Sequence, residues 1–402
     1  MMVTLEDVQA ARQRIFDRIY LSPCARSETL SRLAGCQAFL KLENLQMTGA
    51  YKERGALNKL LTMPSGDRAK GLVAASAGNH AQAVAFHAGR LGISATIVMP
   101  EGTPLIKVVN TRSHGARVVL NGSSYDEAYA EARRMEQAEG LTFVHPFDDP
   151  VVIAGQGTIA LELLEQVPDM EAVLVPVGGG GLLSGIAVAL KALAPAVKVL
   201  GVETELLPSM LASIEEGRLV TVDSATSLAD GIAVKRPGEI TFRHVQKYVD
   251  EIVTVSEEEI ASAILYLLEK EKTVSEGAGA VTVAALLNHK VGGLEGRRVV
   301  ALVSGGNIDV NVIARVIERG LVRDGRLVRI NVALQDKPGQ LAKVSAVVAT
   351  HRANVIEVHH GRAFSHRFGD TTLQLTLETR GPDHVEDILR ALRERGYQVE
   401  RI

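Results

Sequence analysis

The stretch AVLVPVGGGGLLSGIAVALKALAPAVKVLGVE, residues 172–203, decides the fold of this chain. Its apolar start predicts a buried strand that ends at four glycines, and the Leu- and Ala-rich segment after them predicts a helix. The run VKVLGVE then predicts a second strand. A strand, a helix and a strand in this order form a βαβ unit, whose two strands run parallel in one sheet.

The same pattern recurs along the chain. GLVAASAGNHAQAVAFHAGRLGISATIVMP at residues 71–100 and VVLNGSSYDEAYAEARRMEQAEGLTFVHPF at residues 118–147 repeat it, and RRVVALVSGGNI at residues 297–308 ends another strand at glycines. Repeated βαβ units predict an α/β fold with a parallel sheet that helices cover on both faces. Ligands of such sheets bind beyond the carboxyl ends of the strands, where the glycine turns of this chain lie.

Composition and charge narrow the classes of function. The chain has 402 residues and a formal net charge of −3, and its acidic and basic residues are mixed without long blocks. We therefore expect two or three domains, with no nucleic acid and no membrane among the partners. The two cysteines, Cys24 and Cys36, have no CxxC spacing, which argues against a disulfide framework or a zinc site. Reduced thiols, and the lack of a long apolar run, favour a cytoplasmic protein.

The four glycines Gly178, Gly179, Gly180 and Gly181 predict an anion site. They lead from a strand into a helix, where free backbone N–H groups and the helix dipole attract a phosphate. A tight turn that binds nothing is the alternative. No GxxxxGK[ST] motif occurs, so a P-loop is excluded. A nicotinamide dinucleotide stays open although strict GxGxxG fails, because Glu203 follows at about 20 residues, where a ribose-binding acid lies.

Three further candidates lie at strand ends or helix starts. Lys52, in TGAYKERGALNKL at residues 48–60, is either a solvated lysine like its neighbours Arg54 and Lys59 or an amine used in chemistry. The turn SAGNH at residues 76–80 offers N–H groups to a carboxylate and a side-chain amide to a ring oxygen, unless it is an ordinary helix cap. Ser304 of SGGN places a hydroxyl within reach of a ring nitrogen.

A lysine amine, a phosphate cradle, an asparagine and a strand-end serine are the groups that a pyridoxal-phosphate site needs. Through AYKERGA, SAGNHAQ, GGGGLLSG, LADGIAVKRPG, SEGAGA and SGGNID, the chain resembles the serine/threonine dehydratase family of fold type II pyridoxal-phosphate enzymes. The resemblance implies an α/β, tryptophan synthase β-like catalytic domain over residues 1–320. Its parallel sheets are expected in two lobes, with the smaller lobe inserted at residues 50–150.

The resemblance also implies the chemistry and its residues. It implies pyridoxal 5'-phosphate as the cofactor, Lys52 as the catalytic residue that carries it, and β-elimination of L-threonine to 2-oxobutanoate and ammonia, with L-serine as a second substrate. The implied cofactor-binding residues are Lys52, Asn79, Gly178, Gly179, Gly180, Gly181, Glu276 and Ser304. The substrate carboxylate is expected at Ser76, Ala77, Gly78, Asn79 and His80. Glu276 has a second interpretation, a helix-start glutamate stabilised by the dipole.

Several features distinguish this chain from its implied relatives. Serine racemase and hydroxyaspartate ammonia-lyase remain alternative functions on the same scaffold. A nicotinamide-dependent oxidoreductase remains an alternative from a different class of enzyme. Related racemases carry a serine where this chain has Ala77, so we expect little racemisation. They also begin a divalent-cation site at the position of Glu203, but Ser209 replaces the next acid, so no metal ligand is assigned and whether a cation binds near Glu203 stays open. The family often has Ser-Phe before the lysine, whereas Ala50 and Tyr51 stand here, so the packing beside the lysine is expected to differ.

Residues 327–402 follow a different order. They read strand, helix, strand, strand, helix, strand, which is typical of a ferredoxin-like module. The loop DKPGQL at residues 336–341 resembles that of ACT domains, and so implies a regulatory domain that binds a branched-chain amino acid. A module that only joins subunits is the alternative, and we expect a homodimer or homotetramer. The expected effector residues are Asp336, Gly339, Gln340, Leu341 and Asn354.

Overall fold

Residues 172–203 form strand β7 (Ala172–Pro176), helix α9 (Gly181–Leu193) and strand β8 (Lys198–Thr204), as their pattern predicts. β7 and β8 pair in parallel, as a βαβ unit requires. The computed structural model describes residues 2–361 and 369–402. The chain divides into two compact units, Met1–Ile308 and Asp309–Ile402.

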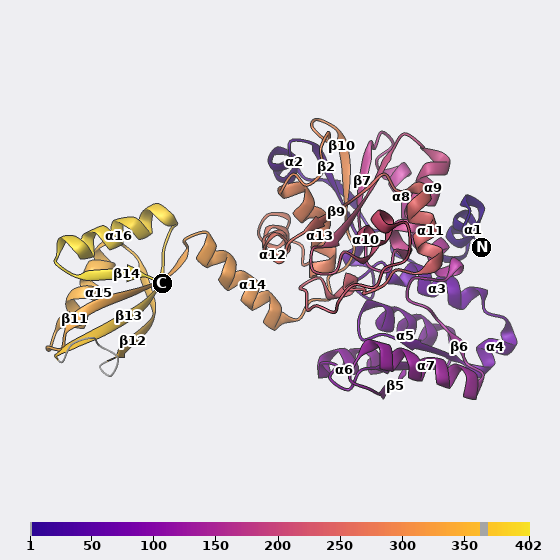
Figure 1. Ribbon diagram of the computed structural model, residues 1–402, viewed down its shortest axis with the longest axis horizontal. Helices are drawn as coiled ribbons and strands as arrows, with labels where there is room; N and C mark the ends of the chain where they lie inside the picture. The colour runs from indigo at the N-terminus through magenta and orange to yellow at the C-terminus, as the bar shows by residue number, and fades with distance from the viewer. Residues whose placement is uncertain (1, 362–368) are drawn as a thin grey trace. The chain divides into compact units, whose positions relative to one another are not determined.

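The larger sheet of the first unit has the strand order β1-β2-β10-β7-β8-β9 (Figure 1). Its strands from β2 onward run parallel to their neighbours, and β1 is antiparallel at the edge. Its other strands are β1 (Cys24–Arg26), β2 (Gln37–Leu42), β9 (Glu251–Val255) and β10 (Arg298–Val303). The accompanying helices and turns are α1 (Leu5–Ile15), α2 (Glu28–Ala34), η1 (Glu43–Leu45), α8 (Pro150–Gln166), α10 (Ser209–Glu216), η2 (Asp230–Ile232), α11 (Glu239–Tyr248), α12 (Glu257–Tyr266), η3 (Leu267–Glu271) and α13 (Gly277–Leu287).

A second parallel sheet, of order β5-β4-β3-β6, lies between β2 and β7 in the sequence. Leu72 and Ala74 of β3 belong to an apolar core shared with α5, whereas Val73 and Ala75 belong to a core shared with α7. Because successive strand residues point to opposite faces, helices cover both sides of this sheet. Its elements are α3 (Lys52–Thr62), α4 (Ser65–Lys70), β3 (Leu72–Ala75), α5 (Asn79–Leu91), β4 (Ala95–Met99), α6 (Leu105–Ser113), β5 (Arg117–Leu120), α7 (Tyr125–Glu139) and β6 (Thr142–Phe143).

The second unit has one antiparallel sheet of order β12-β13-β11-β14. From β11 onward the chain follows the predicted ferredoxin-like order. β11 alternates buried with less buried residues because one of its faces packs on a separate apolar core. Its elements are α14 (Val310–Arg323), β11 (Leu327–Gln335), α15 (Gln340–Thr350), β12 (Asn354–Gly361), β13 (Asp370–Glu378), α16 (Pro382–Glu394) and β14 (Gln398–Arg401). None of the helices described in either unit is long and apolar enough to cross a membrane.

The α/β fold is therefore as predicted, with two parallel sheets followed by an antiparallel module. Three strands of the first unit end at the motifs that the sequence singled out: β3 at SAGNH, β7 at the four glycines and β10 at SGGN. Lys52 begins the helix that follows β2 and the turn η1. These four places define the candidate active site.

Candidate active site

Lys52 is the first residue of α3, and its side chain is partly buried. Its Nζ donates a hydrogen bond to the carbonyl oxygen of Pro146 at 2.9 Å. Burial lowers the pKa of the Lys52 amine to about 8, although the negative charge of Glu276 opposes this shift. A larger fraction of this amine is neutral at physiological pH than for an exposed lysine, which makes it a better nucleophile and base.

The segment before Lys52 is bound to the SGGN turn after β10. The Tyr51 N–H donates to the carbonyl oxygen of Ser304 at 3.1 Å, and the Gly306 N–H donates to that of Gly49 at 2.8 Å. Because β2 and β10 are adjacent parallel strands, the two segments leave the same edge of the sheet. An isolated antiparallel bridge between Ala50 and Gly305 therefore fixes the backbone from which Lys52 projects.

The four glycines form a turn with unused hydrogen-bond donors. None of the backbone N–H groups of residues 178–181 donates to another described residue. Gly180 has a φ of 90°, in the left-handed region that glycine adopts without strain. A Cβ at Gly179 would lie 2.3 Å from the ring of Phe147, so a side chain has no room there. Free N–H groups at the N-terminus of the long helix α9 suit an anion.

The SAGNH turn places Asn79 at the start of α5 and beside Glu276. Asn79 Nδ2 donates to Glu276 Oε1 at 2.6 Å, and Asn79 Oδ1 accepts from Asn307 Nδ2 at 2.8 Å. Ser76 Oγ accepts from the Gly78 N–H at 3.2 Å, which holds the turn in shape. Side chains from α13 and the SGGN turn therefore meet Asn79 at the end of β3.

His80 and Ala77 contribute no charged or acidic side chain to this turn. His80 Nε2 lies 2.9 Å from the carbonyl oxygen of Val144, and burial lowers the pKa of His80 to about 3, so its ring is neutral. Ala77 offers a methyl group. The backbone N–H groups of Ala77, Asn79 and His80 have no acceptor among the described residues, which leaves them available to a carboxylate.

Glu276 lies at the start of helix α13, as one of its two interpretations from sequence predicts, and its role at the cofactor stays a prediction. It is the N-cap residue of the helix, and its buried carboxyl group points to Asn79. Burial raises the pKa of this carboxyl to about 7, and the charge of Asp230 adds to the shift. Because the Glu276 N–H also donates to the carbonyl oxygen of Gly305 at 3.1 Å, the SGGN turn holds the residue in place.

Ser304 and the turn η2 complete the cluster. Ser304 is buried at the end of β10, and its Oγ donates to the carbonyl oxygen of Ala278 at 3.4 Å. η2 links the cluster to the glycine turn: a Cβ at Gly231 would lie 3.5 Å from Glu276 Oε1, and one at Gly178 would lie 2.9 Å from Cα of Ile232. The turn η2 lies within LADGIAVKRPG, one of the motifs that carry the family resemblance, but we predicted no role for it from the sequence.

Comparison with known proteins identifies the family. The sequence matches the pyridoxal-phosphate dependent enzymes over residues 15–305 and the ACT domain over residues 328–396. The chain belongs to the pyridoxal-phosphate-dependent enzyme family. An L-threonine ammonia-lyase of Thermotoga maritima is 52% identical over 399 residues, which are 99% of each chain.

Solved structures of this pyridoxal-phosphate-dependent family share the fold. The processed form of threonine deaminase isoform 2 from Solanum lycopersicum has a TM-score of 0.74 and 38% identity, and the match covers 78% of this chain and 86% of that one. Maize serine racemase has a TM-score of 0.76 and 32% identity, and the match covers 80% of this chain and 99% of that one. The family matches confirm the predicted fold type and the ACT-containing architecture.

The residues present fit the family's cofactor. Pyridoxal phosphate needs an amine for its aldehyde, an anion site for its phosphate and partners for its ring substituents. Lys52, the free N–H groups of residues 178–181, Asn79 and Ser304 are of these types and lie on the turns described above. Family membership also decides between the two phosphate ligands that the sequence left open, in favour of pyridoxal phosphate over a nicotinamide dinucleotide.

The expectation that Arg54 is a solvated cation is wrong. Arg54 is 1% exposed and lies between the carboxylates of Glu43 and Glu162, beside the buried Lys41. These four residues are called the buried ion network below. The one sign of this network in the sequence is a charged residue, Lys41, inside the apolar strand segment QAFLKL. No local pattern reveals which residues pair with it, because Glu162 lies far away in the chain.

The predicted effector residues lie at two opposite ends of the ACT sheet. Asn354 is the first residue of β12 and pairs with Glu378, which also pairs with Leu327 at the start of β11. The loop 336–341 instead follows Gln335, at the other end of β11. At about 3.4 Å per residue, these ends are separated by about 27 Å. Within one chain, the loop and Asn354 therefore cannot contact the same amino acid.

Proposed function

We propose that this protein is a threonine ammonia-lyase, which converts L-threonine to 2-oxobutanoate and ammonia and also acts on L-serine. The observation that carries the proposal is the Lys52 amine, with a pKa of about 8, in a pyridoxal-phosphate family member. The 52% identity to an L-threonine ammonia-lyase over 99% of both chains supports threonine as the substrate. Ala77 has no proton to donate, which argues against a racemase.

Different residues of the chain have different roles in this reaction. Pyridoxal phosphate, when bound, withdraws electrons from Cα of the amino acid and makes its proton acidic. The N–H groups of residues 178–181 hold the phosphate, and those of Ala77, Asn79 and His80 hold the substrate carboxylate and orient the Cα–H bond. With the cofactor and the substrate bound, the Lys52 amine would take the proton from Cα. With one proton added, the β-hydroxyl would leave as water, and water would then hydrolyse the released enamine to 2-oxobutanoate and ammonia.

Ser304 favours elimination over transamination. Its hydroxyl is neutral, whereas a carboxylate in this position would hold a ring nitrogen protonated and stabilise a long-lived carbanion. We propose that Glu276, whose carboxyl has a pKa of about 7 and accepts a hydrogen bond from Asn79, exchanges a proton near the ring. Both residues lie at the turns that hold the backbone of Lys52.

A substrate panel tests the proposal. Purified protein with pyridoxal phosphate is given L-threonine, L-serine or 3-hydroxyaspartate, and the 2-oxoacids are measured. We expect 2-oxobutanoate from threonine at the highest kcat/KM. Borohydride reduction followed by peptide mass spectrometry should locate the cofactor on Lys52. Oxoacid formed from hydroxyaspartate alone, or a label on another lysine, would contradict the assignment.

We further infer that residues 327–402 are a regulatory domain that binds a branched-chain amino acid between two copies of the chain. The positions of loop 336–341 and Asn354 support this inference, because an amino acid that contacts both must take them from different copies. Such a site makes the protein a homodimer or homotetramer. A cytoplasmic location fits the two cysteines, Cys24 and Cys36, which are free thiols.

A further inference from the structure

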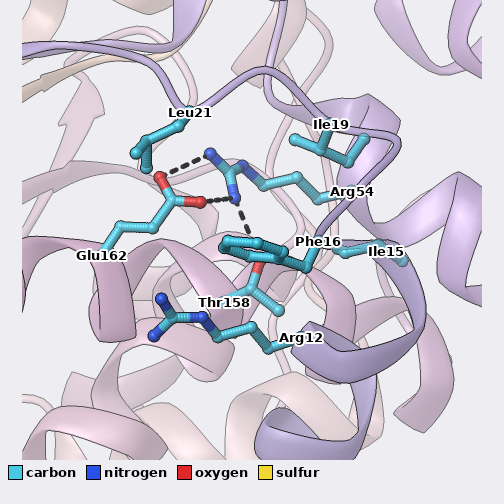
Figure 2. Close-up of a pocket in the computed structure, with 8 residues that line it drawn as sticks. All are labelled: Arg12, Ile15, Phe16, Ile19, Leu21, Arg54, Thr158 and Glu162. Carbon is cyan, nitrogen blue, oxygen red and sulfur yellow. Dashed lines mark hydrogen bonds and ion pairs between the residues drawn. The ribbon is translucent and has the colours of Figure 1, made fainter.

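Arg54 uses all of its hydrogen-bond donors in the protein interior. Its Nε and Nη2 each donate to Glu43 at 2.8 Å, and its Nη1 and Nη2 donate to Glu162 at 2.5 and 2.9 Å. Nη1 also donates to Thr158 Oγ1 at 3.2 Å. Figure 2 shows the guanidinium group directed at Glu162 and Thr158. A guanidinium group has five N–H bonds, so none is left unpaired.

Lys41 completes the buried ion network and likewise uses every donor it has. Its Nζ donates to Glu162 Oε2 at 2.6 Å, to the carbonyl oxygen of Ser22 at 2.8 Å and to Gln166 Oε1 at 3.0 Å. Two cations therefore face two carboxylates. Burial favours a protonated Glu43, but the charges of Arg54 and Lys41 outweigh it and lower the pKa of the Glu43 carboxyl.

The network is not explained by stability alone. Removing charges from water costs several kcal/mol per ion, and a buried ion network roughly recovers that cost through its internal contacts. Apolar residues of similar volume often stabilise a fold as well or better. What ion pairs add is direction, because a planar guanidinium group held on two sides by carboxylates permits one orientation. The cavity beside the network, about 50 Å³, is too small for a metabolite.

The network is attached to the helix that begins with Lys52. Arg54 follows Lys52 by two residues, so at 3.6 residues per turn their side chains leave α3 about 200° apart. Lys52 contacts Pro146, whereas Arg54 contacts η1 and α8 on the opposite side of the helix. Any rotation of α3 that moves the Lys52 amine must therefore also break the contacts of Arg54.

We propose that Lys41, Glu43, Arg54 and Glu162 are positioning residues that fix the rotation of α3 and thereby direct the Lys52 amine to the cofactor. The proposal rests on the proposed role of Lys52. Misplacing a reacting group by about 1 Å costs on the order of 10²-fold in rate, so a small rotation of α3 has a measurable effect. The network acts through Lys52 and does not touch the substrate.

Two variants weaken the network to different degrees. Glu162→Gln removes one of the two carboxylates. Thr158→Val removes one hydrogen-bond acceptor of Arg54, together with the bond from Thr158 Oγ1 to the carbonyl oxygen of Gly155, while both ion pairs remain. The matched control is Glu165→Gln, in the same helix α8, because Glu165 pairs with Arg12 near the surface at 2.6 Å and not with α3. Circular dichroism first establishes a temperature at which each variant is fully folded.

Two measurements at that temperature separate positioning from stability. The first is the rate at which cofactor-free protein takes up pyridoxal phosphate, followed by absorbance. The second is kcat and KM for threonine. We expect Glu162→Gln to reduce the uptake rate and kcat by about 10- to 100-fold, with KM within about twofold of the parent. Thr158→Val should reduce both rates several-fold, and Glu165→Gln should change neither.

The outcomes are distinct. If folded Glu162→Gln and Thr158→Val take up cofactor and turn over threonine as the parent does, the network only stabilises the fold and the proposal is wrong. If Glu162→Gln does not fold, Thr158→Val decides alone. If borohydride reduction of the parent protein labels a lysine other than Lys52, the proposed function fails first, whatever the variants show.

Discussion

At the scale of the residue, the proposed mechanism gives Lys52 two tasks, which are to carry the cofactor and to take the proton from Cα. Lys52→Ala removes both, so we expect turnover of threonine to fall by more than about 10³-fold, since one general base contributes about 10²- to 10⁴-fold. Folding should be unaffected, because the Lys52 side chain makes one hydrogen bond to Pro146. Oxoacid assays and circular dichroism on the purified variant check this. Near-normal turnover by the Lys52→Ala variant would contradict the proposed mechanism.

The pKa of Lys52 predicts how cofactor uptake depends on pH. Only the neutral amine attacks an aldehyde, so the uptake rate of cofactor-free protein should rise about tenfold per pH unit and level off above pH 8, rather than near the ordinary lysine pKa of about 10.4. The charge of Glu276 stabilises the ammonium form, so Glu276→Gln should move the levelling to lower pH. Stopped-flow absorbance measures both curves. A rise that continues to pH 10 would show an exposed amine.

Ala77 predicts the balance between elimination and racemisation. Racemisation needs a proton donor on the face opposite Lys52, and neither the methyl group of Ala77 nor the neutral His80 ring, held at Val144, supplies one. With L-serine as substrate, D-serine should therefore form much more slowly than pyruvate. Ala77→Ser should raise the ratio of D-serine to pyruvate. Chiral chromatography that finds D-serine forming as fast as pyruvate in the parent protein would refute this.

At the scale of the element, the turn between β7 and α9 depends on the absence of side chains. Gly179→Ala places a methyl group against the ring of Phe147, and overpacking of this kind costs about 1 to 3 kcal/mol. Because the turn must widen, we expect affinity for pyridoxal phosphate to fall by about tenfold or more. Equilibrium dialysis measures it. The control Gly66→Ala, which has open space in α4, should bind cofactor normally, and equal affinity in the two variants would contradict the phosphate assignment.

At the scale of the whole molecule, two apolar cores belong to separate units, so the chain should function in separable parts. The ACT core lies within residues 328–399, and the core that includes α8 and α9 lies within residues 3–302. A chain that ends before Arg326 should keep turnover that depends on Lys52. It should lose any response to isoleucine or valine, whose coupling in the full chain is expected to shift threonine half-saturation by about 5-fold or more.

Steady-state kinetics and calorimetry on both chain lengths test this regulation. Asn354→Ala in the full chain is the finer variant, because it should weaken effector binding while leaving basal turnover unchanged. A full chain that neither binds a branched-chain amino acid nor changes its kinetics would leave the ACT domain as a module that joins subunits. A truncated chain that still responds would place the effector site in the first unit.

Local sequence was sufficient wherever the physical cause is local. The spacing of apolar residues was sufficient to predict the strands and helices. Runs of glycine were sufficient to predict the strand ends at which backbone N–H groups are free. Lys52, Asn79 and Ser304 could be selected because each follows or begins such an element. The ACT module could also be predicted from local sequence, because each of its alternating strands and amphipathic helices is one continuous segment of the chain.

Only the tertiary structure decided which distant residues share an environment. Arg54 and Lys59 are alike in sequence, yet Arg54 is buried between Glu43 and Glu162 whereas Lys59 pairs with Asp149 in a partly exposed site. The perturbed pKa values of Lys52 and Glu276, and the separation of Asn354 from loop 336–341, depend in the same way on packing. Burial and charge pairing act through space, so residues more than a hundred positions apart set each other's chemistry, and no local pattern carries that information.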